Sequence, residues 1–375
     1  MTAETDAQRI TRLTPVEDVL ALIETLVKPV EPREVELAGA YEGMLRGVLA
    51  SDVSAGPRPL HAVALRDGWA VAATLTADAG AYAPVPLDPA IRIATGESLP
   101  SGADAVAPAD VVVVGGGQAE IIAPVVAGEG VLAAGADCEP RRPLLRAGAR
   151  LNAVNAAVLA AAGVASVRAR APRICVARAR PGHDDVFGAE CAFINRVIAA
   201  EGAMPSEASA GNLATALGDA AVDAFIALGG TGSGRNDGSI RTLASIGRVE
   251  MHGIALSPGE TAAFGIVGAR PVLMLPGRLD AAIAVWLVVG RRLLARLSGV
   301  AEEQERNTAV LARKIASPLG MTEVVPVRCR NDQAEPLASG YWPLQAIADA
   351  NGWIEVPPGS EGYPAGAEVV IRAWP

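Results

Sequence analysis

The chain has 375 residues, too many for one ordinary domain, so roughly two to four domains are expected. About half of the residues, 51%, are apolar, which is ample for several hydrophobic cores. The net charge of −9 and the pI near 5.1 argue against non-specific binding of nucleic acid or of an acidic membrane surface.

Cysteine and histidine are few and scattered. The four cysteines have no C-x-x-C spacing, and the three histidines are equally dispersed. This excludes a disulfide framework, a zinc ribbon and a histidine-based metal site, and it indicates a reducing cytoplasm. The N-terminus has no apolar signal-peptide core, and the most apolar helix candidate, 281–289, is too short to cross a bilayer. The sequence therefore predicts a soluble cytoplasmic protein without a membrane segment.

The first predicted elements are a helix and a small β module. Apolar residues recur at helical period from Val16 to Val27. Thr14 and Glu17 have the spacing of a capping box, so the Thr14 side chain is expected to cap this helix. Between about 60 and 130, short alternating strands broken by Gly, Pro and Asp predict an all-β module.

From about residue 172 the pattern changes to alternating strands and helices. Strands are predicted at RICVARA, AVDAFIAL and RPVLML, each followed by a helical segment. This alternation predicts a three-layer α/β domain with a largely parallel sheet, in which ligands bind at the carboxyl ends of the strands. Past Gly299, further alternating segments predict a separate C-terminal β domain.

A glycine-rich loop, LGGTGSGRND (228–237), directly follows the second of these strands. Its spacing is not the dinucleotide fingerprint, but glycines let backbone N–H groups approach an anion and form a nest for phosphate oxygens. Asp237 at its end could bind Mg²⁺ carried by such phosphates or orient a nucleophile. The alternative is a tight strand-to-helix turn in which Asp237 caps the helix. The spacing alone leaves both interpretations open.

Four further motifs carry polar residues or prolines at turns. Taken singly, each is explained by a turn or a hairpin. They are Asp67-Gly68 in LRDGWAV, Thr95-Gly96 in RIATGESLP, Ser257-Pro258-Gly259 in ALSPGET and Pro276-Gly277 in LPGRLD. Their order and spacing along the chain are more informative than any one of them.

Together these motifs resemble the molybdopterin molybdenumtransferase family (MoeA and the gephyrin E domain). DGWAV resembles the family's D-G-Y-A-V, RIATGESLPSGADAV its R-I-x-T-G-x-x-x-P-x-G-A-D-A-V, and GGTGSGRND its G-G-x-S-x-G-x-x-D. HGIALSPGE matches H-G-V-A-x-K-P-G-K, LPGRL lies where the family has L-P-G-N-P, and LASGYWPLQAIADANG follows G-S-x-x-L-x-x-x-A-x-A-N-G. The resemblance covers nearly the whole chain, which is identified as a divergent member.

The resemblance implies an elongated, multidomain α/β plus β fold. Its main parts are a three-layer α/β molybdopterin-binding domain, a small β module and a C-terminal β domain. The expected boundaries are 1–29 for an N-terminal helix packing on the α/β domain, 30–54 with 130–171 for a linking α+β domain, 55–129 for the β module, 172–299 for the α/β domain and 300–375 for the C-terminal β domain.

The resemblance also implies a reaction. The family inserts molybdenum from molybdate into the dithiolene of adenylylated molybdopterin and releases AMP, with Mg²⁺ as the divalent cation. It implies a homodimer whose active cleft lies between the subunits, and it leaves other cofactor-biosynthesis proteins or a molybdoenzyme open as further partners. Neither nucleic acid nor a membrane is expected to bind.

Site residues are carried over by their match to the family motifs. Asp67, Thr95 and Asp237 are the expected catalytic residues, and Asp237 is also the expected metal ligand. The residues expected to bind the molybdopterin and its pyrophosphate are Gly229, Gly230, Thr231, Gly232, Ser233, Gly234, Ser257, Pro258, Gly259, Pro276, Gly277 and Ser339.

Several family positions are replaced in this chain. The two lysines of K-P-G-K are Ser257 and Glu260, and Arg278 replaces the Asn of P-G-N-P. The family's T-G-D-E-L has become ARARPGHDD, in which Asp184 or Asp185 is only a loose substitute for its Glu. Loss of the lysines removes attraction for a tetrahedral oxyanion such as molybdate.

Two explanations of these replacements remain open. Arg178, Arg180, Arg235 and Arg278 lie in loops predicted at the same sheet edge and could restore the lost positive charge, since arginine binds oxyanions well. Alternatively, the protein binds a molybdopterin-type ligand, or only a partner, without turnover. Convergence of Arg178, Arg235 and Arg278 on one anion-sized pocket would favour the first explanation.

Overall fold

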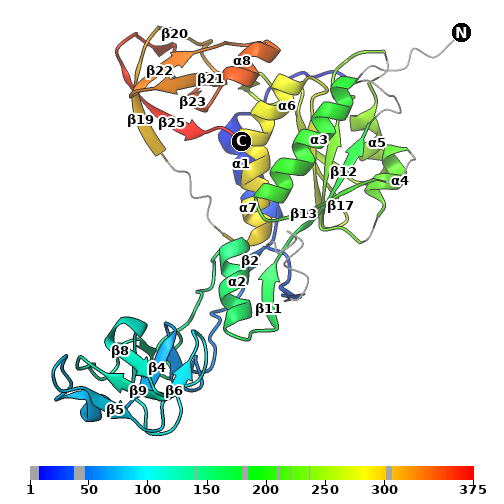
Figure 1. The fold of residues 1–375 in the computed structure, drawn as a ribbon. Coiled ribbons are helices and arrows are strands. Elements are labelled where there is room, and N and C mark those ends of the chain that lie inside the picture. The colour runs from blue at the N-terminus through cyan, green and yellow to red at the C-terminus, as the bar shows by residue number, and fades with distance from the viewer. Residues whose placement is uncertain are drawn as a thin grey trace, which may run out of the picture.

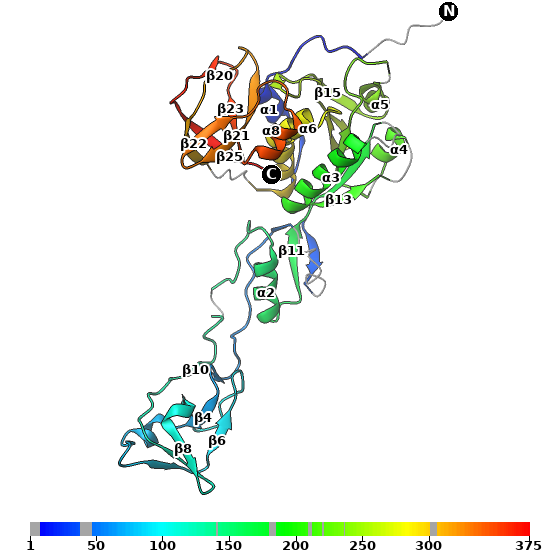
Figure 2. The same ribbon diagram turned by 45° about the horizontal axis from the view of Figure 1, so that its top comes forward.

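The computed structural model describes residues 8–37, 47–139, 142–179, 185–208, 212–219, 221–235, 237–300 and 306–375, the side chains of 185–187 and 306 excepted. The chain is elongated: an α/β domain and a C-terminal β domain lie at one end, and a small β module lies at the other (Figures 1 and 2). The predicted fold class, a multidomain α/β plus β fold with these parts, is confirmed. In the described ranges no helix is long and apolar enough to cross a membrane.

The α/β domain is built on a six-stranded sheet in the order β13-β12-β14-β18-β17-β15. The first four strands run parallel, and β17 and β15 are antiparallel to their neighbours, which confirms the predicted largely parallel sheet. The strands are β12 (Arg173–Arg178), β13 (Met204–Glu207), β14 (Ala224–Leu228), β15 (Arg248–His252), β17 (Ala263–Val267) and β18 (Arg270–Leu275).

Helices cover both faces of this sheet, so the predicted three layers are present. In β14, Ile226 and Leu228 face one core, while Phe225 and Ala227 face the other, because successive strand side chains alternate. The helices on the first face are α1 (Val16–Leu26), α3 (Asp185–Ala200), α6 (Leu279–Val285) and α7 (Arg291–Ser298). Those on the second face are α4 (Leu213–Leu217) and α5 (Ser239–Ile246). A π-helical stretch, Trp286–Gly290, joins α6 to α7.

The predicted capping of α1 by Thr14 is wrong. The helix begins at Val16, with Pro15 as its N-cap and no side-chain cap hydrogen bond. Thr14 instead forms a parallel β-bridge with Ile254, and its N–H donates to the Gly253 carbonyl at 2.9 Å. The backbone of Thr14 is held against the α/β domain, which leaves its side chain without the helix-capping geometry.

A narrow linking region connects the two ends of the molecule. Its sheet has the order β1-β11-β2 and packs on one side of α2 through Ala156 and Leu159. The other side of α2 exposes Val154 and Val158. The elements are β1 (Arg33–Glu36), β2 (Val48–Leu49), α2 (Ala153–Ala161) and β11 (Ser166–Arg170).

The β module contains two three-stranded sheets, β6-β4-β7 and β5-β9-β8, and the short pair β3–β10. The predicted all-β character of this region is confirmed. The elements are β3 (Val63–Ala64), β4 (Gly68–Val71), β5 (Val85–Leu87), β6 (Ile91–Ile93), β7 (Ala105–Ala107), β8 (Val112–Gly115), β9 (Gln118–Ile121), β10 (Val131–Leu132) and the 3-10 turns Ala73–Thr76 and Ala109–Val111.

The C-terminal domain is a six-stranded sheet in the order β16-β21-β22-β19-β25-β23, and an extra β21–β23 pairing curls it toward closure. Strand β16 (Leu256–Ser257) belongs to the preceding α/β segment, so the SPG motif is built into this sheet. The other elements are β19 (Arg306–Leu311), β20 (Ile315–Ala316), β21 (Thr322–Arg330), β22 (Gln333–Pro336), α8 (Leu344–Asp349), β23 (Gly352–Val356), β24 (Gly362–Tyr363) and β25 (Glu368–Ala373).

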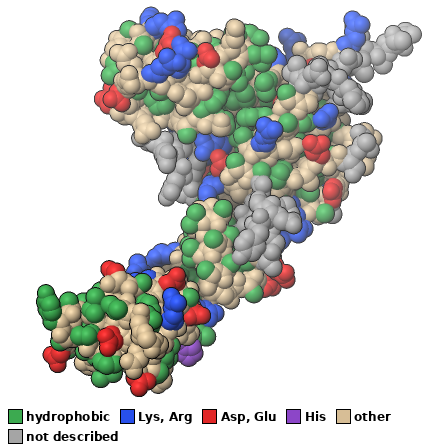
Figure 3. Space-filling model, viewed as in Figure 1, with side chains coloured by type: hydrophobic (Ala, Val, Ile, Leu, Met, Phe, Trp, Pro, Cys, Tyr) green, Lys and Arg blue, Asp and Glu red, His purple; other side chains and the backbone are tan. Residues whose placement is uncertain are grey.

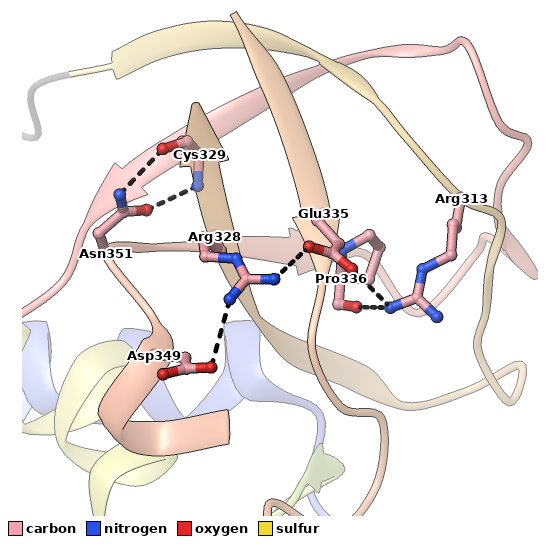
Figure 4. Close-up of polar contacts among 7 residues, drawn as sticks. All are labelled: Arg313, Arg328, Cys329, Glu335, Pro336, Asp349 and Asn351. Carbon is pink, nitrogen blue, oxygen red and sulfur yellow. Dashed lines mark hydrogen bonds and ion pairs between the residues drawn. The ribbon is translucent and has the colours of Figure 1, made fainter. Parts of the chain in front are cut away.

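A polar network fixes α8 to this sheet (Figure 4). Arg328 on β21 bridges Glu335 of β22 at 2.7 Å and Asp349 at the end of α8 at 3.3 Å. The side chain of Asn351 exchanges two hydrogen bonds with the backbone of Cys329. The network holds α8, and with it the loop that leads into α8, which carries Ser339.

Candidate functional site

Three loops that carry candidate residues leave the α/β sheet at one edge. Because β12, β14 and β18 run parallel, the segments after Arg178, Leu228 and Leu275 start from the same side. Gly229 donates its N–H to the Leu275 carbonyl at 2.9 Å, so the glycine loop begins beside the Pro276-Gly277 turn. The predicted meeting of these motifs at the carboxyl ends of the strands is confirmed.

Three consecutive backbone carbonyls of the glycine loop, those of residues 230–232, have side-chain hydrogen-bond partners. The Gly230 carbonyl accepts from Ser239 Oγ at 2.7 Å and from Gln8 Nε2 at 2.6 Å. The Thr231 carbonyl lies 2.9 Å from His252 Nε2, and the Gly232 carbonyl accepts from Gln8 Nε2 at 2.8 Å.

By contrast, the N–H groups of residues 230–233 have no acceptor among the described residues. A row of successive N–H groups that the described part of the chain leaves without acceptors is the arrangement that an anion nest requires.

Glycine is needed in this loop for two different reasons. Gly229 and Gly230 have φ angles of 80° and 70°, the left-handed region that side chains disfavour. At Gly232 the reason is space, since a Cβ there would lie 2.7 Å from Asp237 Oδ2. The loop therefore allows the Asp237 carboxylate to approach its backbone closely.

Asp237 folds back against the loop. Its Oδ2 accepts the N–H of Gly234 at 2.9 Å, and its own N–H donates to the Gly234 carbonyl. Helix α5 has Gly238 as its N-cap and no side-chain cap hydrogen bond. The helix-cap interpretation of Asp237 is therefore not what the structure shows.

The donor set at the loop fits a cation that arrives with its ligand rather than a preformed metal site. No cluster of three or more His, Cys, Asp or Glu side chains suited to a metal exists in the described part of the chain. Asp237 places a carboxylate against the loop backbone at Gly232 and Gly234. Mg²⁺ is commonly held by one or two carboxylates together with substrate phosphates, so Asp237 is compatible with this role.

The SPG turn is packed tightly and carries no positive charge. Ser257 is buried within β16, and Gly259, with φ of 137°, would place a Cβ 2.7 Å from Val285 of α6. Glu260 accepts the N–H of Gly259 at 3.1 Å. Where the resemblance expects two lysines, the structure has a buried hydroxyl group and a carboxylate.

Arg278, in the loop after β18, is already paired. Its Nη2 lies 2.5 Å from Asp280 Oδ2, its Nε lies 3.1 Å from Oδ1, and its guanidinium lies over the Tyr341 ring. The hydrogen bonds that Arg278 donates to the Asp280 carboxylate raise the pKa of Arg278, and Glu260 contributes a smaller attraction. An oxyanion at this position would meet an ion pair rather than a free cation.

Two other arginines that the sequence proposed for anion binding have surroundings different from those of Arg278. Arg178 Nε contacts the Cys191 sulfur on α3 at 3.2 Å, and Arg235 is exposed in the glycine loop. Arg180 and Asp184 lie outside the described residues, as does the side chain of Asp185.

Ser339 is connected to the SPG turn through a buried acid. Its Oγ donates to Glu323 Oε1 at 2.5 Å, and the Gly340 N–H donates to the same oxygen at 3.0 Å. Glu323 is fully buried and lies opposite Ser257 in the β16–β21 pair. Ser339 and Ser257, which are far apart in sequence, are thereby brought to one place.

Asp67 and Thr95 form a local pair in the β module. Asp67 Oδ1 accepts from the Thr95 N–H at 2.7 Å and from the Thr95 hydroxyl at 3.0 Å. These hydrogen bonds hold the pKa of Asp67 below its usual value, and Arg92 adds a weaker attraction. Gly68 is required here because a Cβ would lie 2.2 Å from the Ala107 carbonyl oxygen. The pair is exposed at the surface.

Within one chain this pair does not reach the glycine loop. Asp67 directly precedes β4, which lies in the β module at one end of the molecule, whereas the glycine loop leads into α5 at the other end (Figures 1 and 2). The structure thus assembles two separate halves of the expected site.

Several residues at these places were not predicted from the sequence. His252 lies within the motif HGIALSPGE, which offered a signal for it, and Thr261 Oγ1 lies 2.9 Å from Thr231 Oγ1. Glu323 and Gln8 carry no such signal, because neither lies in a matched motif.

Glu190 on α3 is a further buried acid that the sequence analysis did not single out. It is fully buried, and neither carboxylate oxygen has a hydrogen-bond partner among the described residues. Burial raises the pKa of Glu190 to about 8. It adjoins Cys191, whose thiol pKa is also raised by burial, an effect that Arg178 partly opposes. Near neutral pH this carboxyl is therefore mainly protonated.

Three family models match the chain. The MoeA N-terminal region (domain I and II) matches residues 14–163, the Probable molybdopterin binding domain matches 202–296, and the MoeA C-terminal region (domain IV) matches 308–374. The three matches follow one another along the chain and include the β module, the glycine loop and Ser339.

Individual proteins are similar over different spans. Molybdopterin molybdenumtransferase 1 of Mycobacterium tuberculosis is 26% identical over 340 residues, which cover 80% of this chain and 78% of the relative. A molybdopterin biosynthesis protein of Methanocaldococcus jannaschii is 30% identical over 151 residues, which cover 40% of this chain and only 36% of that relative. The crystal structure of a molybdopterin biosynthesis MoeA protein from Pyrococcus horikoshii matches with a TM-score of 0.69 at 25% identity, covering 96% of this chain and 99% of that one.

Proposed function

Because the chain belongs to the MoeA family of molybdenum-cofactor biosynthesis proteins, we propose that it binds adenylylated molybdopterin and inserts molybdate into it, releasing AMP. The observation that carries this proposal is the row of N–H groups of residues 230–233 in the glycine loop, for which the described residues supply no acceptor. A pyrophosphate linkage supplies the anionic oxygens that such a row binds.

Each expected site residue has a role in this proposal. Backbone N–H groups of the glycine loop hold the pyrophosphate, and Asp237 holds Mg²⁺, which would neutralise phosphate charge. The turns at Ser257-Pro258-Gly259 and Pro276-Gly277, together with Ser339, line the pterin side of the site.

Asp67 and Thr95 close the site from a second subunit. Their pair lies at the far end of the chain from the glycine loop, so a cleft that uses both halves requires two copies (Figures 1 and 2). Exposed apolar side chains on the β module and on α2 support association (Figure 3). They include Leu60, Leu65, Tyr82, Val113, Val114, Val154 and Val158. The proposed assembly is a homodimer.

A second candidate function is binding of the same ligand without turnover. The specific observation in its favour is the charge at the molybdate end, where Arg278 is neutralised by Asp280 and Glu260 replaces a lysine. A tetrahedral dianion gains little from such a neutral or acidic surface. In this case the protein would store or deliver molybdopterin to another cofactor-biosynthesis protein or to a molybdoenzyme.

The location we propose is the cytoplasm. All four cysteines are free thiols, and three of them, Cys138, Cys175 and Cys191, are buried. Free thiols that form no disulfide bonds are typical of proteins in a reducing compartment.

One experiment separates the two functions. The purified protein is incubated with adenylyl-molybdopterin, Mg²⁺ and molybdate, and AMP is measured by chromatography, with parallel reactions that lack molybdate. Molybdate-dependent AMP release supports the transferase. Tight binding of the nucleotide form without AMP release supports the binding protein, and absence of binding rejects both.

A further inference from the structure

The side chain of Gln8 is buried at the glycine loop, although it precedes the matched family region, which begins at residue 14. Its Nε2 donates to the Gly230 and Gly232 carbonyls at 2.6 and 2.8 Å. Its Oε1 accepts the N–H of Ile240 in the first turn of α5 at 3.2 Å. One side chain therefore joins both ends of the loop.

These contacts determine which way the loop peptides face. In a trans peptide the carbonyl of one residue and the N–H of the next point in opposite directions. Since the carbonyls of Gly230 and Gly232 point toward Gln8, the N–H groups of Thr231 and Ser233 point away from it. The Thr231 carbonyl points toward His252 Nε2, so the N–H group of Gly232 in the same peptide points away from His252.

Gln8 also accepts a hydrogen bond from an N–H group of α5 that could otherwise bind an anion. The N–H groups in the first turn of a helix attract anions, and Gln8 Oε1 takes that of Ile240. An anion is thereby directed to the N–H row of the loop rather than to this amide of α5.

An amide side chain matches this environment, because it offers two N–H donors and one carbonyl acceptor. A carboxylate at position 8 would bring negative oxygen against two carbonyl oxygens. A leucine of similar size would leave the Gly232 carbonyl and the Ile240 N–H without their partner.

The segment that carries Gln8 is anchored next to His252. Thr14 donates its N–H to the Gly253 carbonyl at 2.9 Å, and the Thr14 carbonyl accepts from Ala255 at 2.8 Å. Gly253, with φ of 96°, lies so close to Ile10 that a Cβ would be 2.6 Å from Ile10 Cγ2. The chain segments that carry Gln8 and His252, two of the side chains that bind the loop carbonyls, are thus joined at one point of the fold.

We infer that Gln8 is a positioning residue, which sets the glycine loop in its anion-accepting conformation. The identity of the ligand rests on the proposed function, whereas the effect of Gln8 on the loop does not. The two are therefore tested by separate measurements on the same variants.

The variants are Gln8→Leu and Gln8→Glu, with Arg9→Ala at the exposed neighbouring position as the matched control. Hydrogen–deuterium exchange of residues 229–240 reports the loop, and calorimetric titration with inorganic pyrophosphate plus Mg²⁺, and with adenylyl-molybdopterin, reports the ligand. Thermal unfolding verifies that each variant is folded.

We expect both Gln8 variants to exchange faster in residues 229–240 and nowhere else. We also expect Gln8→Leu to weaken binding of both probes about tenfold, which corresponds to ~1.4 kcal/mol. Gln8→Glu should weaken binding more, and Arg9→Ala should change neither measurement.

Unchanged exchange in folded Gln8→Leu would overturn the inference, as would faster exchange with unaltered affinity. If the wild-type protein binds neither probe while Gln8→Leu still speeds exchange, the proposed function fails and the control of loop conformation by Gln8 is supported.

Discussion

Arg278 and Asp280 form a two-point ion pair where the loop after β18 enters α6, with oxygen–nitrogen distances of 2.5 and 3.1 Å. The same Asp280 carboxylate accepts the N–H of Trp342 at 3.1 Å, so the pair also fixes the C-terminal domain against the α/β domain. Arg278, which the sequence suggested as a replacement for the lost lysine charge, therefore pairs with a carboxylate that holds two domains together. This relationship is the main physical argument for reduced molybdate attraction.

Replacing the Asp280 carboxylate by an amide should leave the positive charge of Arg278 without its counter-ion. In Asp280→Asn the amide oxygen still accepts the Trp342 N–H, while Arg278 loses its counter-ion. Because the Arg278 side chain is 56% exposed, we expect a modest loss of stability, about 1 kcal/mol or less. Molybdate affinity should rise several-fold in calorimetry. The gain should vanish in Asp280→Asn combined with Arg278→Gln, and an unchanged affinity in the single variant would contradict the argument.

The proposed inter-subunit site predicts complementation between inactive variants. Asp67→Asn and Asp237→Asn should each abolish AMP release, since they remove opposite halves of the cleft. Mixing the two under conditions that exchange subunits should form heterodimers with one intact site. Random pairing gives about half heterodimers and hence about a quarter of wild-type activity. A mixture that stays inactive despite verified exchange would show that both residues act within one chain.

The glycine loop predicts a contrast between Gly232, within the loop, and Gly238, the N-cap of α5. In Gly232→Ala the new Cβ would lie 2.7 Å from Asp237 Oδ2, so the carboxylate must move and the loop must change shape. We expect pyrophosphate affinity to fall about tenfold, equivalent to ~1.4 kcal/mol. Gly238→Ala is the matched control, because its Cβ meets nothing closer than Arg241 at 3.5 Å. Equal pyrophosphate affinities of the two variants would show that the close contact between Asp237 and the backbone of Gly232 is not needed for binding.

Glu190 predicts a pH-dependent stability. Its pKa is about 8 in the folded protein, whereas the ordinary value for a glutamate is 4.5, so between these pH values the folded state binds a proton that the unfolded state has lost. The free energy of unfolding should therefore fall as pH rises through this window, by about 1.4 kcal/mol per pH unit at most. Below about pH 4.5 both states are protonated, and above about pH 8 the loss is complete.

Glu190→Gln, which imitates the protonated acid, should remove this dependence. Its Tm should equal that of the wild type near pH 4.5 and exceed it progressively up to pH 8. A Tm difference that does not vary with pH would indicate that Glu190 has a partner in its charged form.

Much of the fold was predictable because its signals are local. Strand–helix alternation after residue 172 predicted the three-layer domain, and short punctuated strands predicted the β module. The failures occurred where distant segments meet. Thr14 has the local signal of a helix cap, yet its backbone is bridged to Ile254, and Ser257 joins the sheet of another domain.

For the site, the sequence by itself determined which chemical groups are present: the glycine loop, Asp237, the Asp67 and Thr95 motifs, and the loss of the two lysines. These are properties of residue identity and spacing. The tertiary structure alone decided that the loop carbonyls are held by Gln8 and His252, and that Arg278 is neutralised by Asp280 and covered by Tyr341. Hydrogen bonds and ion pairs act over a few ångströms between residues that can be more than 200 positions apart, as in the Gln8–Gly230 pair, and spacing along the chain does not encode them.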